Sequence, residues 1–401
     1  MIQLKPWMAF FLFVFLLTAC SEATPSIHEL ALTYAAQTRT AMPTDTLIPP
    51  PTETPEPTAT ATQTSTATQV QSQWPLGPTG FPDDVNPLTG LAVSDASNLS
   101  RRPVLVKVAN YPESGRPHAG LSSADLVFEY FIGYGMNRFI ALYYGQNAEK
   151  IGPIRSGRLV DPQIVNMYEG VLGFWGAYVT ILDHIEDILG ARALSGMVDA
   201  CPAMCDDGGG LVTSKFGDSQ LITELAEARG VVNTKYLLEG MVFDPQAPAT
   251  DEEGVQVNIL YSSTNRGEWR YDEESGSYLR WIEDRSGGQL EMIPLIDRET
   301  EEQLSFANVI VVFAYHTEYA PSMHDIELWG NTTGERAVIF RDGMALDVLW
   351  KVPRNDQPIQ FVDEAGEHVA LKPGNSWIVF MGQSSSVTTD DSSWTFNFYL
   401  P

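Results

Sequence analysis

The stretch "DLVFEYFIGYGMNRFIALYYG" (residues 125–145) contains two apolar runs, 125–131 and 138–145, around a glycine-containing turn. Both runs are short and rich in aromatic and β-branched residues, a composition typical of β-strands. Side chains alternate between the two faces of a strand, so Asp125, Val127, Glu129 and Phe131 share one face of the first run. We therefore expect two strands here, with Glu129 as a polar residue among large apolar ones.

Strand-like and helix-like segments alternate on either side of this pair. Helical periodicity and start and stop residues predict helices over 160–170, 178–190 and 218–230, the first with Asp161 as N-cap and the last capped by Asp218. Apolar runs at 103–110 and 171–176 predict two further strands. Interleaved strands and helices indicate an α/β subdomain, which we assign to residues 81–243.

A polar, proline-containing segment, 243–254, separates this region from a strand-rich one. We take the segment as a domain boundary and expect a mostly β subdomain over 255–401. The Asp-Gly pair in "RDGM" (341–344) predicts a tight hairpin turn. The expected fold class is therefore α+β, with an α/β subdomain followed by a β-rich one. The expected strands are 255–261, 267–272, 276–283, 308–315, 325–329, 335–340, 344–350, 376–382 and 394–400.

The first nineteen residues have the pattern of a secretory signal peptide. The apolar run at 9–19 has eleven residues, too few to span a bilayer, which requires about 20. It ends in "LLTAC" (16–20), which resembles the bacterial lipobox. That resemblance implies that Cys20 carries a thioether-linked diacylglycerol and, on its new amine, a further acyl chain such as palmitate, which together give durable membrane anchoring. The alternative is an ordinary cleaved signal peptide with Cys20 as an incidental thiol.

Residues 20–80 follow as a linker that cannot form a core. Ten of the 31 residues in 43–73 are Thr and six are Pro, a composition typical of an extended, disordered stalk. We therefore expect a folded body held away from the membrane on the extracytoplasmic face.

The net charge of the chain is −27, from 24 Lys and Arg against 51 Asp and Glu. Such a chain repels nucleic acid at long range, so we exclude nucleic acid as a partner. Any anion that it binds must be attracted by a local group of basic residues.

The segment "EKIGPIRSGRLVDP" (149–162) offers such a group. Arg155 and Arg158 flank Ser156 and Gly157 in a loop just before the helix expected from 160. A guanidinium fits a phosphate or carboxylate with two parallel hydrogen bonds, and a helix N-terminus adds donors. We therefore predict anion binding by these four residues. The alternative is that the arginines pair with acids such as Asp125 or Glu129 and only hold the fold together.

Glu129 is a weak candidate for an acid or base in catalysis. Asp125 and Glu129 lie on one strand face, but such pairs are common without any chemistry, and an ion pair with Arg155 or Arg158 would equally explain Glu129. The His, Asp and Glu residues of 183–187 and His118 look like surface residues. Trp269, Tyr271, Tyr278 and Trp281 are expected in the core, although exposed aromatic residues would suit sugar stacking.

Two cysteines, Cys201 and Cys205, would remain after lipidation. A local disulfide is favoured outside the cytoplasm, over a metal site or free thiols. We expect no metal site and no cofactor, and the common hydrolase and nucleotide-binding motifs are absent from the sequence.

The segments "NPLTGL" (86–91), "GLSSADLVFEY" (120–130), "IGPIRSGR" (151–158) and "LKPGNSWIVF" (371–380) together resemble the YerB-like lipoprotein family, whose domain is known as DUF3048. The resemblance extends over about residues 86–400. It implies a lipid anchor and N-terminal and C-terminal subdomains, and it implies no known reaction.

These observations predict a lipid-anchored envelope protein whose partner is a wall component, an anionic ligand or another protein. An envelope hydrolase acting on a phosphorylated or glycan substrate is the alternative, with Arg155 and Arg158 binding the anion. A purely structural role for the arginines is the third possibility. The sequence leaves open whether the protein is an enzyme.

Overall fold

The computed structural model describes residues 74–247 and 249–401, which belong to one compact unit. The expected signal peptide, Cys20 and most of the expected stalk lie outside the described residues. No helix in the described ranges is long and apolar enough to cross a membrane.

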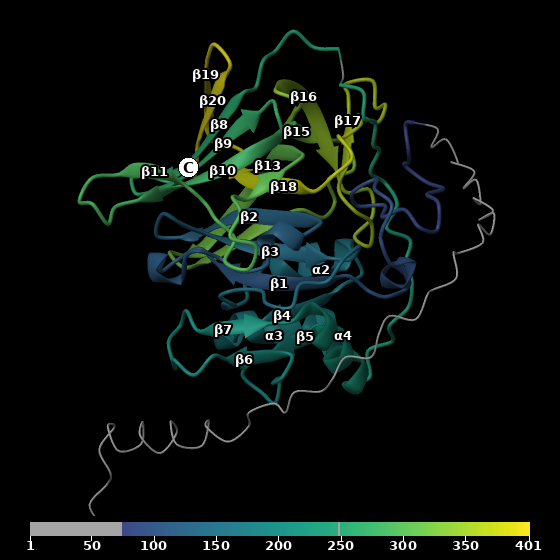
Figure 1. The fold of residues 1–401 in the computed structure, drawn as a ribbon, viewed down its shortest axis with the longest axis vertical. Helices are drawn as coiled ribbons and strands as arrows, with labels where there is room; N and C mark the ends of the chain where they lie inside the picture. Colours follow the sequence, from purple (N-terminus) through teal and green to yellow (C-terminus); the bar gives the residue numbers. More distant parts are fainter. Residues whose placement is uncertain (1–73, 248) are drawn as a thin grey trace, which may run out of the picture. The chain divides into compact units, whose positions relative to one another are not determined.

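A large mixed sheet forms the centre of the fold (Figure 1). Its strands follow the order β17-β16-β15-β13-β18-β2-β3-β1-β4-β5, and β14 pairs with β13 outside this row. Their bounds are β1 Val104–Ala109, β2 Leu126–Gly133, β3 Met136–Tyr143, β4 Val171–Phe174, β5 Ala193–Ser195, β13 Asn308–Ala320, β14 Met323–Glu327, β15 Glu335–Arg341, β16 Met344–Lys351, β17 Gln360–Val362 and β18 Ser376–Gly382.

A second sheet contains strands from the later part of the chain only, in the order β11-β10-β9-β8-β20-β19 with β12 paired to β10. A two-stranded ribbon, β6-β7, completes the β-structure of the described residues. The bounds are β6 Met204–Asp206, β7 Lys215–Gly217, β8 Gln256–Ser262, β9 Asn265–Asp272, β10 Ser277–Asp284, β11 Glu291–Pro294, β12 Ser305–Phe306, β19 Ser386–Asp390 and β20 Ser393–Asn397.

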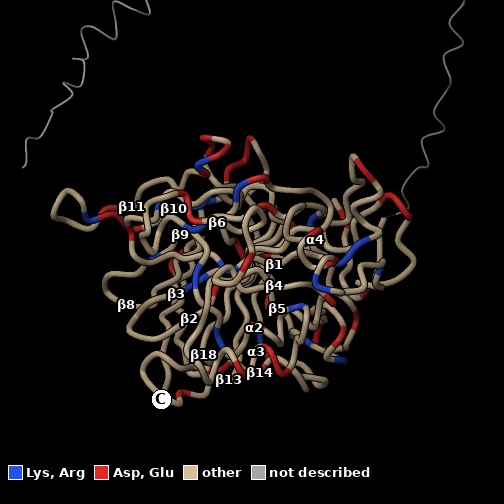
Figure 2. The backbone as a smooth tube through the Cα atoms, turned by 90° about the horizontal axis from the view of Figure 1, so that it is seen from below, with Lys and Arg blue, Asp and Glu red and all other residues tan. Residues whose placement is uncertain are grey.

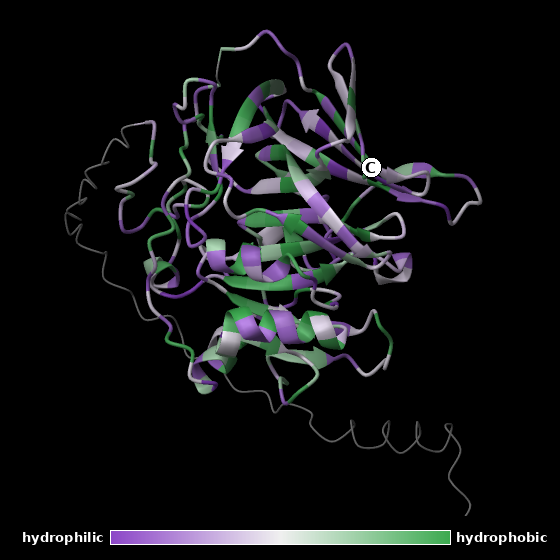
Figure 3. Ribbon diagram, turned by 180° about the vertical axis from the view of Figure 1, so that it is seen from behind, coloured by the Kyte–Doolittle hydropathy of each residue, from purple (hydrophilic) through white to green (hydrophobic). Residues whose placement is uncertain are grey.

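Within the described residues, three α-helices lie against the large sheet, together with short 3-10 turns. Apolar residues of α2 and α3 pack on one face, while α4 and the second sheet pack on the other. Figure 3 shows hydrophobic residues concentrated in the strands, whereas the helices carry both kinds of residue. The bounds are α2 Asp161–Met167, α3 Val179–Leu189, α4 Ser219–Ala228, η1 Ala96–Ser100, η2 Glu113–Gly115, η3 Leu121–Ser123 and η4 Gly190–Arg192.

Strand direction creates one functionally important edge. β13, β18 and β2 are parallel, and β1, β4 and β5 are parallel. β3 is antiparallel to both β2 and β1, so all six of these strands run in the same direction. Their carboxyl ends therefore meet at one edge of the large sheet, and we call it the carboxyl edge.

The expected elements agree with this fold in type and approximate position. The strand pair at 125–145 forms β2 and β3 in the middle of the large sheet, and Asp218 caps α4 by accepting hydrogen bonds from Gln220 N and Leu221 N. The first region does combine strands with helices, and the second is mostly β. The part of the chain that the structure describes is, as a whole, mostly β-structure.

Two details differ from expectation. The N-cap of α2 is Val160, and Asp161 is the first helical residue instead. The large sheet also crosses the expected boundary at 243–254, because β18 from the second region pairs in parallel with β2 from the first. The two regions therefore share one sheet.

Candidate functional site

The segment 149–162 lies at the carboxyl edge, between β1 and the continuation of β4. On one side Arg155 N donates to Lys107 O at 3.0 Å, and on the other Trp175 N donates to Arg155 O at 3.0 Å. In open α/β sheets, ligands bind in the crevice outside the carboxyl ends of the strands. The segment predicted to bind an anion thus occupies the position where this type of sheet usually binds ligands.

Glycine is required where the segment passes close to its neighbours. A Cβ on Gly152, whose φ is +154°, would stand 2.7 Å from Lys215 O. A Cβ on Gly157 would stand 2.4 Å from Ile185 Cδ1 of α3. Both distances are shorter than van der Waals contact, so the glycines allow the backbone to sit deep in the edge.

Three arginines meet at this segment, and we call Arg138, Arg155 and Arg158 the arginine cluster. Arg138 comes from β3, and its Nη1 donates to Ser156 O at 3.0 Å. Arg158 Nη1 donates to Gly157 O at 2.8 Å. Arg138 and Arg158 are buried, at 6% and 7% exposure, and Arg155 is half-buried.

No carboxylate of the described residues lies within 4.0 Å of the guanidinium group of any arginine in the cluster. The Nε atoms of all three are buried and lack a hydrogen-bond partner there. The alternative of pairing with Asp125 or Glu129 does not occur. Asp125 accepts hydrogen bonds from the backbone amides of Tyr144 and Gly145, and Glu129 pairs with an arginine of the second sheet.

Lys107 and Asp161 form a buried ion pair beside the cluster. Lys107 Nζ donates to Asp161 Oδ1 at 2.8 Å, and Arg158 N donates to Asp161 Oδ2 at 2.7 Å. Tyr130 OH also donates to Asp161. Burial lowers the pKa of Lys107 to about 7, against the opposing effect of Asp161. Asp161 therefore fixes the segment to β1, and it is already engaged by three donors of the chain itself.

Burial and mutual repulsion disfavour the charges of the cluster. Burial lowers the pKa of Arg138 well below its ordinary value, and the nearby charges of Arg158 and Arg155 lower it further. Burial likewise lowers the pKa of Arg158 and of Arg155. A guanidinium keeps its proton at neutral pH, so these directions indicate an unfavourable energy of placing three positive charges together. A bound anion would offset that energy.

Glu129 lies on the opposite face of the large sheet from Lys107 and Asp161. Its carboxylate is buried and accepts hydrogen bonds from Arg280 Nη2 at 3.1 Å and from Trp377 Nε1 at 2.7 Å. It also accepts one from Asn137 Nδ2 at 2.5 Å. Glu129 thus joins the two sheets through an ion pair with Arg280, and the sheet separates it from the arginine cluster.

Arg280 is a buried residue whose position was not predicted from the sequence. Its guanidinium lies beside the rings of Trp269 and Trp377, with Cζ 4.8 and 5.2 Å from the ring centroids. It also lies against Gly267, where a Cβ would stand 2.2 Å from Arg280 Nη2. These four residues, together with Glu129, are distant in sequence, so no local motif points to them.

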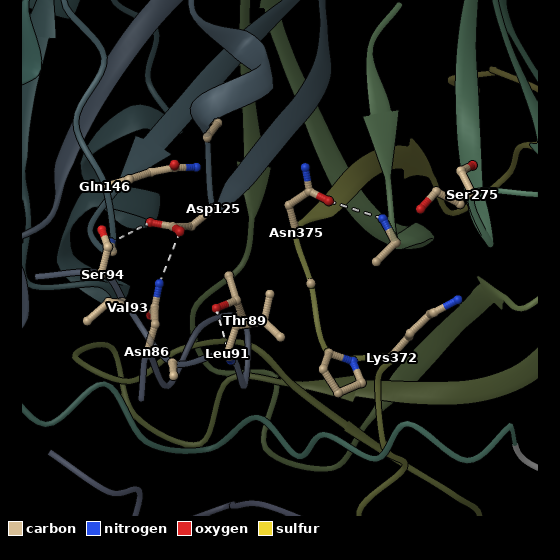
Figure 4. A pocket seen from close by; sticks show the side chains of 17 residues that line it. Asn86, Thr89, Leu91, Val93, Ser94, Asp125, Gln146, Ser275, Lys372 and Asn375 are labelled. Carbon is tan, nitrogen blue, oxygen red and sulfur yellow. Dashed lines mark hydrogen bonds between the residues drawn. The ribbon is translucent and has the colours of Figure 1, made fainter. Parts of the chain in front are cut away.

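A separate cavity of about 440 Å³ lies at the opposite end of β2 and β3 (Figure 4). Asp125 is buried in its wall, accepts a hydrogen bond from Asn86 Nδ2 at 3.0 Å, and has a pKa raised to about 6 by burial. Lys372 also lines the cavity, but its Nζ is 2.8 Å from Asp342 Oδ1. The other polar groups in the described lining are neutral hydroxyls and amides, so this cavity offers no free cation to an anion.

The remaining candidates have clear positions. Cys201 and Cys205 are joined by a disulfide. His118 is fully buried, with Nε2 2.9 Å from Ala109 O, so its interpretation as a surface residue is wrong. Trp269 and Tyr278 are buried, as expected for core residues. No group of three or more potential metal ligands occurs in the described ranges.

Two family profiles match the chain. The one described as "Protein of unknown function (DUF3048) N-terminal domain" matches residues 88–208, and the one for the DUF3048 C-terminal domain matches 255–378. This chain belongs to the DUF3048 family. The two DUF3048 matches lie on either side of the segment 243–254.

Comparison with single proteins agrees with the DUF3048 assignment. A Bacillus subtilis (strain 168) protein named "Putative lipoprotein YerB" is 27% identical over 304 residues, which cover 73% of this chain and 84% of that protein. The crystal structure of the Bacillus subtilis YerB protein superimposes with a TM-score of 0.61 at 26% identity, covering 74% of this chain and 96% of that one. The resemblance to the YerB-like family is thus confirmed.

Proposed function

We propose that this DUF3048 protein is a lipid-anchored protein of the extracytoplasmic membrane face that binds a phosphate or carboxylate group in the arginine cluster. Support for the anchor comes from "LLTAC" (16–20) and from the name of the Bacillus subtilis relative, which includes the word lipoprotein. Cys20 would carry the lipid, and residues 20–80 would form the stalk.

One observation carries the binding proposal. The guanidinium groups of Arg138, Arg155 and Arg158 converge at the carboxyl edge without a salt-bridge partner among the described residues, in a chain whose net charge is −27. Figure 2 shows acidic segments in the outer loops, so partners for surface cations are plentiful elsewhere. A buried cation normally has a partner, and its absence supports an external anion as the missing one.

The ligand would be a wall component, a small anion or an acidic group of a partner protein. Each guanidinium presents several donors in a plane, and this arrangement matches the oxygen atoms of a phosphate or carboxylate. The backbone at Ser156 and Gly157 would line the same site.

The geometry favours binding over hydrolysis. Glu129, the candidate acid or base, is enclosed between the sheets and engaged by Arg280 and Trp377. Asp161 is the carboxylate beside the cluster, and it is held by Lys107 Nζ and Arg158 N. Neither carboxylate is placed to exchange a proton with a substrate held by the arginines.

Thermal unfolding in the presence of different anions tests the proposal. The chain without residues 1–20 should be stabilised by phosphate or by a carboxylate, and more than by chloride at equal ionic strength. A ligand at 100 times its dissociation constant adds about 2.7 kcal/mol. Arg354→Gln is the control variant, and anions should stabilise it as they stabilise the parent, because Arg354 is exposed and paired with Asp356. An unchanged melting temperature with every anion would refute the binding proposal.

The lipid anchor has its own test. Cys20→Ser should move the protein from the membrane fraction to the soluble one, because the lipid supplies the anchoring energy. Retention of the Cys20→Ser variant in the membrane fraction would contradict lipid anchoring through this residue.

A further inference from the structure

Large apolar side chains are exposed on three loops around the arginine cluster. They come from the start of α3, from the loop after β5 and from the loop between β6 and β7. We call them the apolar rim, and each is more than half exposed: Tyr178, Val179, Met197, Val198, Leu211 and Val212.

One hydrogen bond and two nearby positions place this rim beside the arginines. Arg155 Nη1 donates to Val212 O at 3.4 Å. Tyr178 is near enough to Arg158 and Arg138 to raise their pKa values. Met197 lies over Gly176, where a Cβ would stand 2.4 Å from its Sδ atom. Gly157 N in turn donates to Gly176 O at 2.9 Å, so Met197 borders the segment 149–162.

A cationic centre with an apolar border has a specific chemical complement. A free phosphate ion would satisfy the arginines and leave the exposed apolar side chains of the rim in water. An anionic lipid satisfies both parts, since its phosphate can enter the cluster while the rim contacts the acyl boundary. Tyrosine in the rim suits the interface between headgroups and acyl chains.

The charge of the whole chain restricts how such contact could occur. At −27 the body repels an anionic membrane at long range, but salt screens this repulsion beyond about 8–10 Å. The body therefore approaches such a surface favourably only through a face that presents cations. A lipid anchor at Cys20 would keep this face at a high effective concentration near the membrane.

We infer that the arginine cluster and the apolar rim together form a docking surface for an anionic phospholipid membrane. A lipid phosphate binds Arg138, Arg155 and Arg158, and the rim inserts at the headgroup boundary. This inference rests on the proposed anion binding at the same cluster, and it adds the membrane surface as the source of the anion.

Vesicle sedimentation tests the inference with the chain that lacks residues 1–20, so that the lipid anchor does not contribute. Vesicles of phosphatidylcholine mixed with phosphatidylglycerol should bind the protein, and vesicles of phosphatidylcholine alone should not. The double variant Leu211→Ser, Val212→Ser should bind the mixed vesicles about tenfold more weakly, because two apolar side chains no longer leave water on binding. The same variant should bind inorganic phosphate as the parent does.

A matched control comes from two exposed apolar residues outside the rim, Val232 and Leu237. The double variant Val232→Ser, Leu237→Ser should bind mixed vesicles like the parent.

The outcomes separate the two proposals. If inorganic phosphate does not bind the parent, the proposed anion site itself fails. If phosphate binds but mixed vesicles do not, the membrane inference is overturned and the anion site stands. Vesicle binding that the rim variant retains in full would also overturn the inference, because the attraction would then be electrostatic alone.

Discussion

Glu129 and Arg280 illustrate how a single residue acquires its role from distant parts of the chain. Glu129 was a candidate acid or base because it is a polar residue in an apolar strand. In the fold its carboxylate pairs with Arg280 across the two sheets, and both side chains are fully buried. The residue that looked catalytic in the sequence thus holds the sheets together.

Glu129→Gln should lower the free energy of unfolding by about 3–5 kcal/mol, because it leaves Arg280 as an uncompensated buried charge. Urea unfolding monitored by fluorescence gives this value. Asp356→Asn removes one partner of the exposed pair with Arg354 and should change it by less than about 1 kcal/mol. A Glu129→Gln variant as stable as the parent would contradict the structural role of this pair.

His118 makes the stability of the protein depend on pH. Burial lowers its pKa to about 3, while a histidine in the unfolded chain binds a proton near pH 6.5. Between these values the unfolded state binds more protons, so the free energy of unfolding falls as the pH falls, by up to about 1.4 kcal/mol per pH unit.

His118→Gln should remove this contribution, and unfolding measured from pH 7 to pH 5 should show a shallower dependence than in the parent. His316, whose pKa burial lowers to about 4, acts in the same direction and remains in both proteins. His368→Gln is the comparison: burial lowers the pKa of His368 as well, but this residue is exposed, so its substitution should change the slope less than His118→Gln. Equal slopes for parent and His118→Gln would show that His118 does not titrate in this way.

A site residue could be predicted when it lies close in sequence to the other residues of its site. Arg155 and Arg158 stand three apart in one loop, so the sequence alone indicated a basic site in an acidic chain. Arg138 was not predicted, because it reaches the cluster through the pairing of β3 with β1. Arg280 was missed for the same reason.

At the level of elements, the segment 149–162 depends on tight packing at the carboxyl edge. A Cβ added to Gly152 would stand 2.7 Å from Lys215 O. A backbone oxygen cannot move aside as the end of a flexible side chain can. The position of Arg155 therefore depends on a glycine three residues earlier.

Gly152→Ala should lower the free energy of unfolding by about 1–3 kcal/mol and weaken phosphate binding, because the segment must shift away from β7. Gly287→Ala is the matched control, since a Cβ there meets no atom within 4 Å. Urea unfolding and phosphate titration of both variants check this. A Gly152→Ala variant that matches the parent in both would show that the segment does not need this close approach.

Element types were predictable where periodicity was strong. Most strands of the large sheet and the three helices follow from apolar patterns in the sequence. Five of the strands that escaped prediction, β5, β6, β7, β12 and β17, have only two or three residues, too few for a pattern to emerge. Asp161 was assigned as an N-cap from its residue type, but its carboxylate is used by Lys107 and Tyr130 instead.

At the level of the whole molecule, the shared sheet explains why local patterns could not give the architecture. Local sequence patterns separated the chain at 243–254, but β18 inserts between β13 and β2 and so joins both regions in one sheet. Pairing between strands about 250 residues apart is set by the complete fold. The carboxyl edge, and with it the arginine cluster, exists only in that complete arrangement.

The effect of removing one arginine tests the proposal that the arginine cluster binds an anion. Asp161 offsets the repulsion among Arg138, Arg155 and Arg158 only in part, and a bound anion would offset more of it if the cluster is a binding site. Removing one of them should then weaken anion binding and leave the ligand-free protein at least as stable as before. If the arginines are scaffold, removal should destabilise the protein instead.

The decisive measurement is a calorimetric titration of inorganic phosphate into the chain without residues 1–20 and into its Arg155→Gln variant. We expect the parent to bind phosphate and the variant to bind at least about tenfold more weakly, since a charged hydrogen bond contributes about 1.5–3 kcal/mol. The melting temperature of the ligand-free variant should equal or exceed that of the parent. If the parent binds no phosphate, or if Arg155→Gln binds it equally well, the cluster is not the anion site that we propose.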